Sequence, residues 1–293
     1  MVAFRDLPQD SRAIAGGKGA SLSRMAIAGL PVPPGFVIAA GALQGVLDSC
    51  GGLTLIEGLT TNLDVDDARA VEHAADSIRE MIVSTPVPAP LAHAILAAHA
   101  AMEHGELVAV RSSAVAEDGL TASFAGQQES YLNVRGDAIL DRVRECWASF
   151  FSPRALFYRA QKAVIGDTRM AVVVQEMVQA DKSGVMFTVD PVRNRRECMI
   201  IEGAPGLGDA IVSGEITPDH YAVSRDDGAI VDAFIPEHQR GRVLSETELN
   251  RLREIGLRLE AFFGSPQDVE WCIRGPELLV LQSRPITTLG AHG

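Results

Sequence analysis

The chain has 293 residues, of which 47% are hydrophobic and 22% are charged, a composition typical of a globular protein with one large domain or two lobes. Its 38 acidic residues against 26 basic ones give a formal net charge of −12, which argues against a nucleic-acid-binding surface. No apolar run approaches the roughly 20 residues of a membrane span, the first residues lack a signal-peptide pattern, and the 4 cysteines lack metal-binding spacing, so we expect a cytoplasmic protein without structural zinc.

The first part of the chain is predicted to be mostly helical. Residues 16–30 open with glycines and continue as a helix that Gly29 ends. A proline-rich extended stretch then leads into a short strand, and residues 40–105 form helices with a break at 84–90. The next stretch, residues 106–114, contains a short apolar strand that is predicted to end at Arg111.

Strands predominate in the second part. Residues 245–264 nevertheless predict a helix, with a capping box of Ser245 and Glu248 and a stop at Gly264. The other predicted segments are a strand at 130–134, a helix at 138–161 interrupted near Pro153, and strands within 170–178, 183–192, 199–223 and 268–287. Early helices followed by late strand pairs predict an α+β fold of two lobes, which we divide into residues 1–174 and 175–293.

The stretch GGKGAS, residues 16–21, combines features that bind phosphate. Glycines let the backbone approach an anion, a helix N-terminus offers N–H groups, and Lys18 adds a charge. It is not a P-loop, because Gly19 follows the lysine where that motif has Ser or Thr. The alternative is a capping turn with a solvated lysine.

Arg111, followed by two serines, suits a bidentate phosphate contact, although an arginine near a strand end can equally pair with a surface carboxylate. The loop GLTASFAGQQ, residues 119–128, is rich in small residues and is either a mobile lid over a ligand or an inert surface loop. Glu202, ahead of a glycine-rich stretch, could accept a ribose hydroxyl.

The apolar strand VVVQEMV, residues 172–178, ends in polar residues. Backbone groups at such a strand end can pair with an adenine edge, and Met177 would supply a soft apolar contact to the ring. The alternative is a core strand with a polar end.

The hairpin DVEWCIRGPELLVLQSRPIT, residues 268–287, places Asp268, Glu270, Gln282 and Arg284 among apolar side chains. Because side chains alternate along a strand, Glu270 lies opposite Gln282 only with an odd loop length or a bulge, which we predict. The pair would then present oxygens to a hard cation, and Arg284 would neutralise a polyphosphate. The alternative is an internal salt bridge among the four groups.

Several stretches together resemble the nucleotide-binding domain of the dikinase family, which includes pyruvate phosphate dikinase, phosphoenolpyruvate synthase and rifampicin phosphotransferase. The resemblance spans residues 14–288 and is weakest in 40–105. It is carried by GGKGASL, PVPPGFVI, VAVRSSAVAED, ASFAGQQESYLNV, CWASFFSPRALFYR, SGVMFTVDP, GLGDAIVSGEITPD and DVEWCI with LLVLQSRPITT.

The resemblance implies an ATP-grasp fold with the nucleotide between the lobes and a phosphotransferase that needs ATP and Mg²⁺. It implies that Glu270 and Gln282 hold the metal, and that Lys18, Arg111, Asp268 and Arg284 act on the phosphates. It also implies a nucleotide-binding set of Gln175, Glu176, Met177, Val178 and Glu202, together with Thr121, Gly126 and Gln127 in a lid loop at 116–128. One departure is EDGLTASF, where relatives usually have a proline before ASF.

Members of that family pass the β-phosphoryl group of ATP to a histidine on a swivelling domain and from there to an acceptor. None of the 7 histidines here sits in such a motif, and His220 is interpreted as structural. We therefore expect part of a longer enzyme, or one subunit, whose histidine and acceptor domains are supplied in cis or in trans. A rifampicin-like antibiotic and pyruvate are the candidate acceptors. A non-catalytic ATP-sensing regulatory subunit is the alternative, and neither reading involves a nucleic acid or a membrane.

Overall fold

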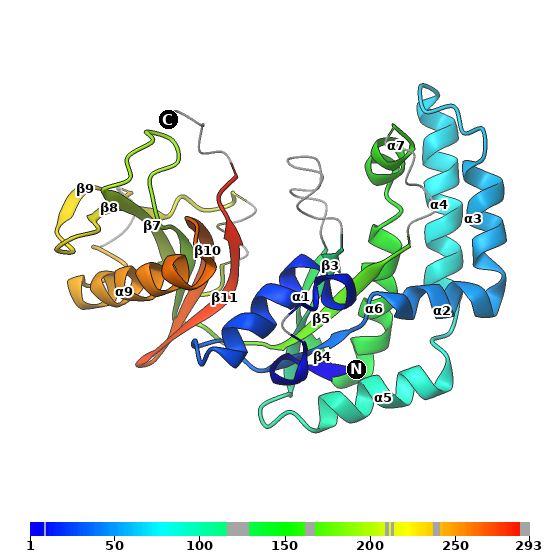
Figure 1. Cartoon of the computed structure of the whole chain (residues 1–293), viewed down its shortest axis with the longest axis horizontal. Helices are drawn as coiled ribbons and strands as arrows, with labels where there is room; N and C mark the ends of the chain where they lie inside the picture. Colours follow the sequence, from blue (N-terminus) through cyan, green and yellow to red (C-terminus); the bar gives the residue numbers. More distant parts are fainter. Residues whose placement is uncertain are drawn as a thin grey trace. The chain divides into compact units, whose positions relative to one another are not determined.

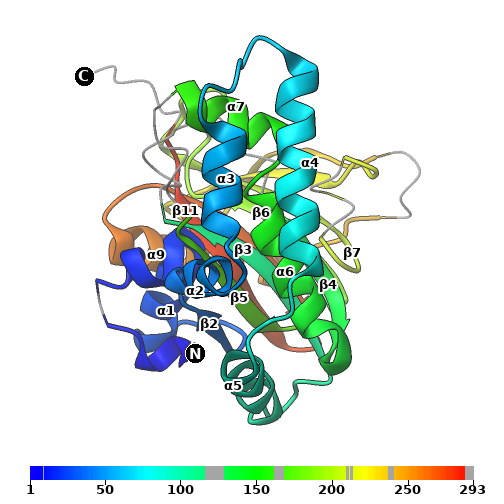
Figure 2. The ribbon, with the colours of Figure 1, turned by 90° about the vertical axis from the view of Figure 1, so that its right-hand side faces the viewer.

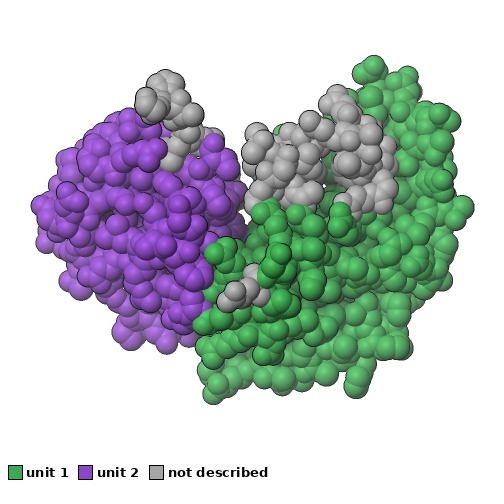
Figure 3. All heavy atoms as spheres, in the orientation of Figure 1, with its two compact units in different colours: residues 1–27, 34–177 green, residues 28–33, 178–293 purple. Residues whose placement is uncertain are grey.

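The structure, a computed structural model, describes residues 1–8, 10–115, 129–161, 168–208, 211, 214–236 and 241–287. The chain forms two compact units, shown in different colours in Figure 3. Unit 1 comprises Met1–Ile27 and Pro34–Met177, and unit 2 comprises Ala28–Pro33 and Val178–Gly293. The chain therefore enters unit 2 twice, once for a short segment and once near the position at which we divided the lobes.

Unit 1 is built on a five-stranded antiparallel sheet in the order β1-β2-β5-β3-β4 (Figure 1). Every residue of the central strand β5 is buried, as its continuous apolar run predicts for a strand covered on both faces. The strands are β1 (Val2–Ala3), β2 (Gly35–Ile38), β3 (Leu107–Ala114), β4 (Ser130–Arg135) and β5 (Met170–Glu176).

Helices pack around this sheet and confirm the helical prediction for residues 40–105 and the interruption near Pro153. The amphipathic α4 lies beside α3 and α6 (Figures 1 and 2) and buries residues at helical spacing, among them Val71, Ile78 and Ile82. The helices are α1 (Arg12–Ile27), α2 (Gly41–Cys50), α3 (Gly52–Thr60), α4 (Ala68–Ser84), α5 (Ala89–Ala100), α6 (Ile139–Ser149) and α7 (Pro153–Gln161), with 3₁₀ turns at Phe4–Asp6 and Gly136–Ala138.

In the part of the chain that the structure describes, no single helix is long and apolar enough to cross a membrane. The α4 and α5 helices meet the length and composition criteria only as a pair, which is bent by 74°.

Unit 2 is built on a six-stranded antiparallel sheet in the order β11-β10-β6-β7-β8-β9. Its helix α9 (Glu246–Phe263) begins with the predicted capping box of Ser245 and Glu248 and ends at Gly264, which has a φ of 75°. The strands are β6 (Lys182–Phe187), β7 (Cys198–Pro205), β8 (Asp219–Ser224), β9 (Ile230–Phe234), β10 (Gln267–Arg274) and β11 (Glu277–Pro285).

One face of the unit 2 sheet is covered by α9, which lies across it in Figure 1. Gly256 of α9 packs directly against Met186 of β6 and Met199 of β7. The side chains of the covered face are fully buried and come from neighbouring strands: Met186, Ile201, Tyr221, Val269 and Trp271. Because side chains alternate along each strand, the residues between them point to the opposite face.

The segment Ala28–Pro33 belongs to unit 2 because it lies along the outer edge of β11. The Val280 N–H donates to the Pro31 carbonyl at 2.7 Å. This bond pairs a backbone donor of an edge strand. Pro31 cannot donate a bond back to β11, because proline has no N–H.

Trp271 is accommodated by glycines on the neighbouring strands. A Cβ atom at Gly184 would lie 1.8 Å from the Glu202 carbonyl oxygen and 2.6 Å from the Trp271 ring. Gly184 therefore allows β6 and β7 to pair closely beside a large buried indole.

We predict that Gly184→Ala destabilises the protein by about 1–3 kcal/mol or more, because the added methyl group would overlap backbone atoms that cannot move without breaking the sheet. Urea denaturation measures the effect. Gly45→Ala is the control, since a methyl group there meets nothing within 4 Å, and it is expected to stabilise the helix by up to about 1 kcal/mol. An unchanged midpoint for Gly184→Ala would contradict the prediction.

Candidate functional site

The GGKG stretch lies in a broken helix. Helical residues already precede it, from Arg12, and the break falls at Gly16, which has a φ of 67° and a ψ of −178°. A Cβ atom at Gly16 would lie 2.2 Å from the Ser113 carbonyl oxygen. Only glycine fits both the backbone conformation and this close approach to β3.

Ser113 of β3 holds the break in place. Its hydroxyl donates to the Ala15 carbonyl at 2.8 Å and accepts from the Gly19 N–H at 3.1 Å. It therefore satisfies one backbone group on each side of Gly16, as an N-cap side chain does for an ordinary helix start. The side chain is fully buried, so water does not compete for these bonds.

Lys18 contacts β3, the strand that carries Arg111. The Lys18 ammonium donates to the Ser112 carbonyl at 3.2 Å, next in the chain to Arg111. The prediction that the strand ends at Arg111 was wrong, because β3 continues to Ala114 and Arg111 lies opposite Ser130 and Val173. The two serines after Arg111 are buried and paired with β5, and they do not start a loop.

Residues 175–178 close the central strand of unit 1 and start unit 2. The Glu176 N–H donates to the Pro34 carbonyl at 2.8 Å, and the Met177 N–H donates to the Leu107 carbonyl at 3.0 Å. Both donors are therefore already used within unit 1. Among the described residues, the Val178 N–H has no hydrogen-bond partner, so it is the backbone donor of this segment that a ligand could use.

The hairpin confirms the predicted register. Arg274 pairs with Glu277 around a two-residue loop, Trp271 pairs with Val280, and the register then shifts so that Glu270 lies opposite Gln282. The extra residue is Leu281, which makes the bulge that the even loop length requires. Gln282 is 6% exposed, and its Oε1 atom is buried with no hydrogen-bond partner in the described part of the chain.

Asp268 and Arg284 form an ion pair on the same hairpin. Arg284 donates to Asp268 Oδ2 at 2.8 Å, with the carboxylate 15% exposed and the guanidinium 56% exposed. Burial raises the pKa of the Asp268 carboxyl above its ordinary value and Glu270 adds to the shift, while Arg284 opposes it. Two of the four polar groups thus form an internal salt bridge, and the arginine keeps an exposed side.

Successive pairings place Glu202 on the same face as Glu270. Gln282 lies opposite Glu270, Glu270 opposite Val185, and Val185 opposite Glu202. The register continues from Glu202 to His220 and from His220 to Phe234. We call this line the cross-strand row; it lies on the face opposite α9 and consists of Gln282, Glu270, Val185, Glu202, His220 and Phe234.

The predicted lid loop at 116–128, with Thr121, Gly126 and Gln127, lies outside the described residues. Lys18 and Arg111 belong to unit 1, while Glu202, Asp268, Glu270, Gln282 and Arg284 belong to unit 2. The unit 2 residues share one face of its sheet, whereas in unit 1 Lys18 lies in α1 and Arg111 lies in β3.

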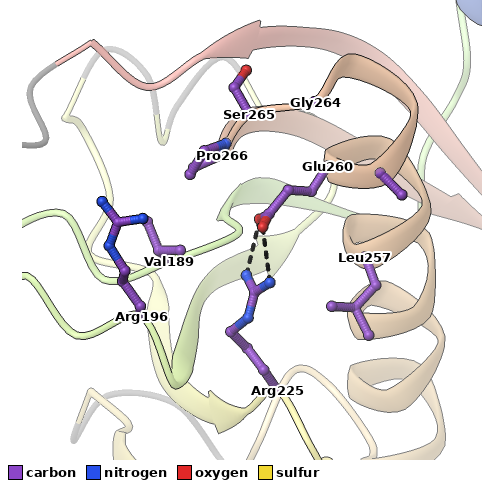
Figure 4. Close-up of a pocket in the computed structure, with 9 residues that line it drawn as sticks. Val189, Arg196, Arg225, Leu257, Glu260, Gly264, Ser265 and Pro266 are labelled. Carbon is purple, nitrogen blue, oxygen red and sulfur yellow. Dashed lines mark hydrogen bonds and ion pairs between the residues drawn. The ribbon is translucent and has the colours of Figure 1, made fainter.

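A hollow of about 610 Å³ lies elsewhere in unit 2, at the end of α9 (Figure 4). There Arg225 donates to both carboxylate oxygens of Glu260 at 2.9 Å and to the Thr188 carbonyl. Burial acts to raise the pKa of Glu260, but hydrogen bonds from the Arg225 and Thr188 side chains, together with the charge of Arg225, hold that pKa below its ordinary value. No predicted site residue is among its lining residues, which are Val189, Arg196, Arg225, Leu257, Glu260, Ala261, Gly264, Ser265 and Pro266.

Comparison with known protein families identifies the kind of domain that this chain forms. The family described as pyruvate phosphate dikinase, AMP/ATP-binding domain, matches two overlapping stretches, residues 12–243 and 232–292. The chain belongs to this family. It is therefore an ATP-binding domain of the dikinase type, and the predicted family resemblance is confirmed.

Curated relatives match almost the whole chain. It is 43% identical to a probable phosphoenolpyruvate synthase of Methanothermobacter thermautotrophicus, over 98% of the chain and 46% of the relative. It is 39% identical to a rifampicin phosphotransferase of Streptomyces sviceus and 34% identical to one of Bacillus cereus, each over 98% of the chain and 36% of the relative. The chain thus spans less than half the length of these relatives.

Among solved structures, the chain is similar to the ATP-grasp ligase PsnB complexed with a minimal precursor, with a TM-score of 0.32 and 12% identity over 96% of the chain and 55% of that chain. A likeness this low carries no argument about fold or function. The assignment to the predicted α+β, ATP-grasp class rests on the family match and on the two-sheet architecture.

Sequence reasoning missed the role of Ser113. It noted small hydroxyls beside Arg111, but only the pairing of β3 with β5 and the position of α1 reveal that this one spans the helix break. The usable signal was a glycine-rich helix start that lacks a Ser, Thr, Asp or Asn of its own at the cap position.

We predict that Ser113→Ala destabilises the protein by about 1–3 kcal/mol, because it leaves a buried N–H and a buried carbonyl without their partner. Chemical denaturation measures the change. Ser84→Ala is the matched control in unit 1. That serine is exposed, and its hydroxyl donates to the Met81 carbonyl within its own helix, so its loss is expected to cost less than about 0.5 kcal/mol. Equal costs for the two variants would refute a capping role for Ser113.

Proposed function

We propose that the chain binds Mg·ATP and delivers the β-phosphoryl group to a histidine on a separate swivelling domain, leaving AMP. The pairing of Glu270 with Gln282 beside the Asp268–Arg284 ion pair carries this proposal. It puts two oxygen ligands and a partly exposed cation on one face of a hairpin in a member of the dikinase ATP-binding family.

The residues present fit a magnesium ion. Gln282 Oε1 is a buried acceptor without a hydrogen-bond partner among the described residues, which is costly unless a cation or a ligand donor satisfies it. Glu270, directly opposite, adds a carboxylate. Mg²⁺ takes a few protein oxygens and completes its shell with water and phosphate; when bound, it would neutralise charge on the phosphates.

Lys18, Arg111 and Arg284 are the proposed phosphate ligands. The break at Gly16 and the Ser113 bonds fix the backbone around Lys18, so its charge is presented from a rigid segment. Arg284 is held by Asp268 through one carboxylate oxygen and remains more than half exposed, which leaves guanidinium N–H groups able to reach a phosphate. Asp268 thus acts by orienting Arg284.

Residues 175–178 and Glu202 are proposed to bind the nucleoside. The engaged donors of Glu176 and Met177 make the Val178 N–H the proposed donor to the adenine ring, with Gln175, Glu176 and Met177 lining it. Glu202 lies in the cross-strand row with Glu270 and would accept a ribose hydroxyl. Thr121, Gly126 and Gln127 of the lid loop are proposed to close over the phosphates.

These roles suit phosphoryl transfer, which depends on positioning and on charge neutralisation more than on a covalent group of the protein. The histidine domain and the acceptor domain would be supplied in cis or in trans. Pyruvate and a rifampicin-like antibiotic are the proposed final acceptors, because relatives named for each of these reactions match the chain. A cytoplasmic location is proposed with them.

We expect AMP to form when the chain is incubated with ATP, Mg²⁺ and a histidine domain of the dikinase type, because the chain supplies the phosphate-binding half of the reaction. Nucleotide separation on an ion-exchange column measures AMP. A histidine-domain variant without the acceptor histidine is the control. Tight ATP binding without AMP would favour the ATP-sensing regulatory subunit in place of the enzyme.

We expect Glu270→Ala and Gln282→Ala each to weaken Mg·ATP binding at least about tenfold, a loss of about 1.4 kcal/mol, because each removes a metal ligand. Isothermal titration with and without EDTA measures this: chelation should weaken wild-type binding strongly and either variant only slightly. Glu277→Ala, an exposed glutamate of the same hairpin, is the matched control and should behave as wild type. Equal EDTA sensitivity in all four proteins would exclude this pair as the metal site.

A further inference from the structure

The cross-strand row continues beyond Glu202 to a histidine that the proposed function does not use. Glu202 of β7 and His220 of β8 are direct partners in the sheet, and His220 Nδ1 lies 3.2 Å from Glu202 Oε1. The His220 side chain is 34% exposed and the Glu202 side chain is 31% exposed. The pair is therefore accessible from the face opposite α9 without being freely solvated.

The direction of this hydrogen bond follows from its chemistry. A carboxylate oxygen only accepts, so the imidazole donates from Nδ1. The bond occupies Oε1 of Glu202, and a carboxylate has acceptor capacity on both oxygens. Oε2 thus remains an acceptor for a second donor, with its direction set by the histidine.

Glu202 lies too far along the row from Glu270 to contact the phosphates at the proposed metal site, and its position suits the ribose of the same nucleotide. Two strand spacings of about 4.8 Å separate it from Glu270, so the two carboxylates lie about 10 Å apart along the row. Val185, the residue between them, offers no polar side chain. A ligand that binds a metal at Glu270 and extends along the row would meet its next polar side chain at Glu202.

We propose that His220 is a positioning residue that fixes the Glu202 carboxylate so that the site prefers a ribonucleotide to its deoxy analogues. This inference rests on the proposed function, because it takes Mg·ATP as the ligand of the row. A free glutamate loses side-chain entropy when it binds a hydroxyl. His220 removes that cost before the nucleotide arrives, and the same hydroxyl bond then contributes more to affinity.

The test compares ATP with 2′-deoxy-ATP and 3′-deoxy-ATP as ligands of the full 293-residue chain in Mg²⁺, by isothermal titration. Wild type is expected to bind ATP about tenfold more tightly than at least one deoxy analogue, the ratio that about 1.4 kcal/mol provides. His220→Ala should weaken ATP binding several-fold while leaving the affinity for that analogue unchanged, so the ratio falls towards one. His220→Asn should restore the ratio, because its amide nitrogen can donate from nearly the position of Nδ1.

Two controls isolate the pair. His93→Ala, at an exposed position of α5, should leave both affinities as in wild type. In a Glu202→Ala background, which should itself remove the preference, adding His220→Ala should change nothing further. Thermal unfolding of each variant separates loss of folding from loss of selectivity.

The outcomes distinguish this inference from the proposed function. A wild-type ratio retained in His220→Ala, or a wild-type chain that binds ATP and both deoxy analogues equally, overturns the positioning role while ATP binding stands. A chain that binds none of the three nucleotides overturns the proposed function, and the inference falls with it.

Discussion

One extra residue in β11, Leu281, determines which side chains share the polar face of unit 2. Without the bulge at Leu281, that leucine would lie opposite Glu270, and Gln282 would pair with Val269 on the face that α9 buries. The bulge lets the hairpin keep Trp271 and Val280 in the core and still place Glu270 opposite Gln282. The hairpin thus has its core side chains Trp271 and Val280 on the face that α9 covers and its charged side chains on the opposite face.

The register set by this hairpin reaches across the sheet through ordinary strand pairing. Gly184 permits β6 to pair closely with β7 beside Trp271, and this pairing aligns Glu202 with Glu270. In unit 1 the proposed phosphate-binding residues lie on two different elements, Lys18 after the break in α1 and Arg111 in β3. There Gly16 and Ser113 join the two elements, so a small conformational choice in α1 and one hydroxyl in β3 position Lys18.

Local patterns predicted much of this fold, because alternation, capping boxes and turn residues act over a few positions. They led to the bulge, to the start and end of α9 and to the family, whose motifs are contiguous. They failed at Arg111, where two serines suggested a strand end but pairing with β5 continues. They also could not align Glu202 with Glu270 or with His220, because those contacts depend on pairings between strands far apart in the sequence.

The excursion of Ala28–Pro33 into unit 2 bears on how the domain can be recombined with its relatives. A chimaera joined at Met177 would carry a foreign β11 against the host's residues 28–33, and the bond between Val280 and the Pro31 carbonyl would then join segments of different origin. Unit 2 is consequently not a cassette that one crossover can exchange. An exchange of unit 2 must also exchange Ala28–Pro33, six residues that lie in the sequence between the two segments of unit 1.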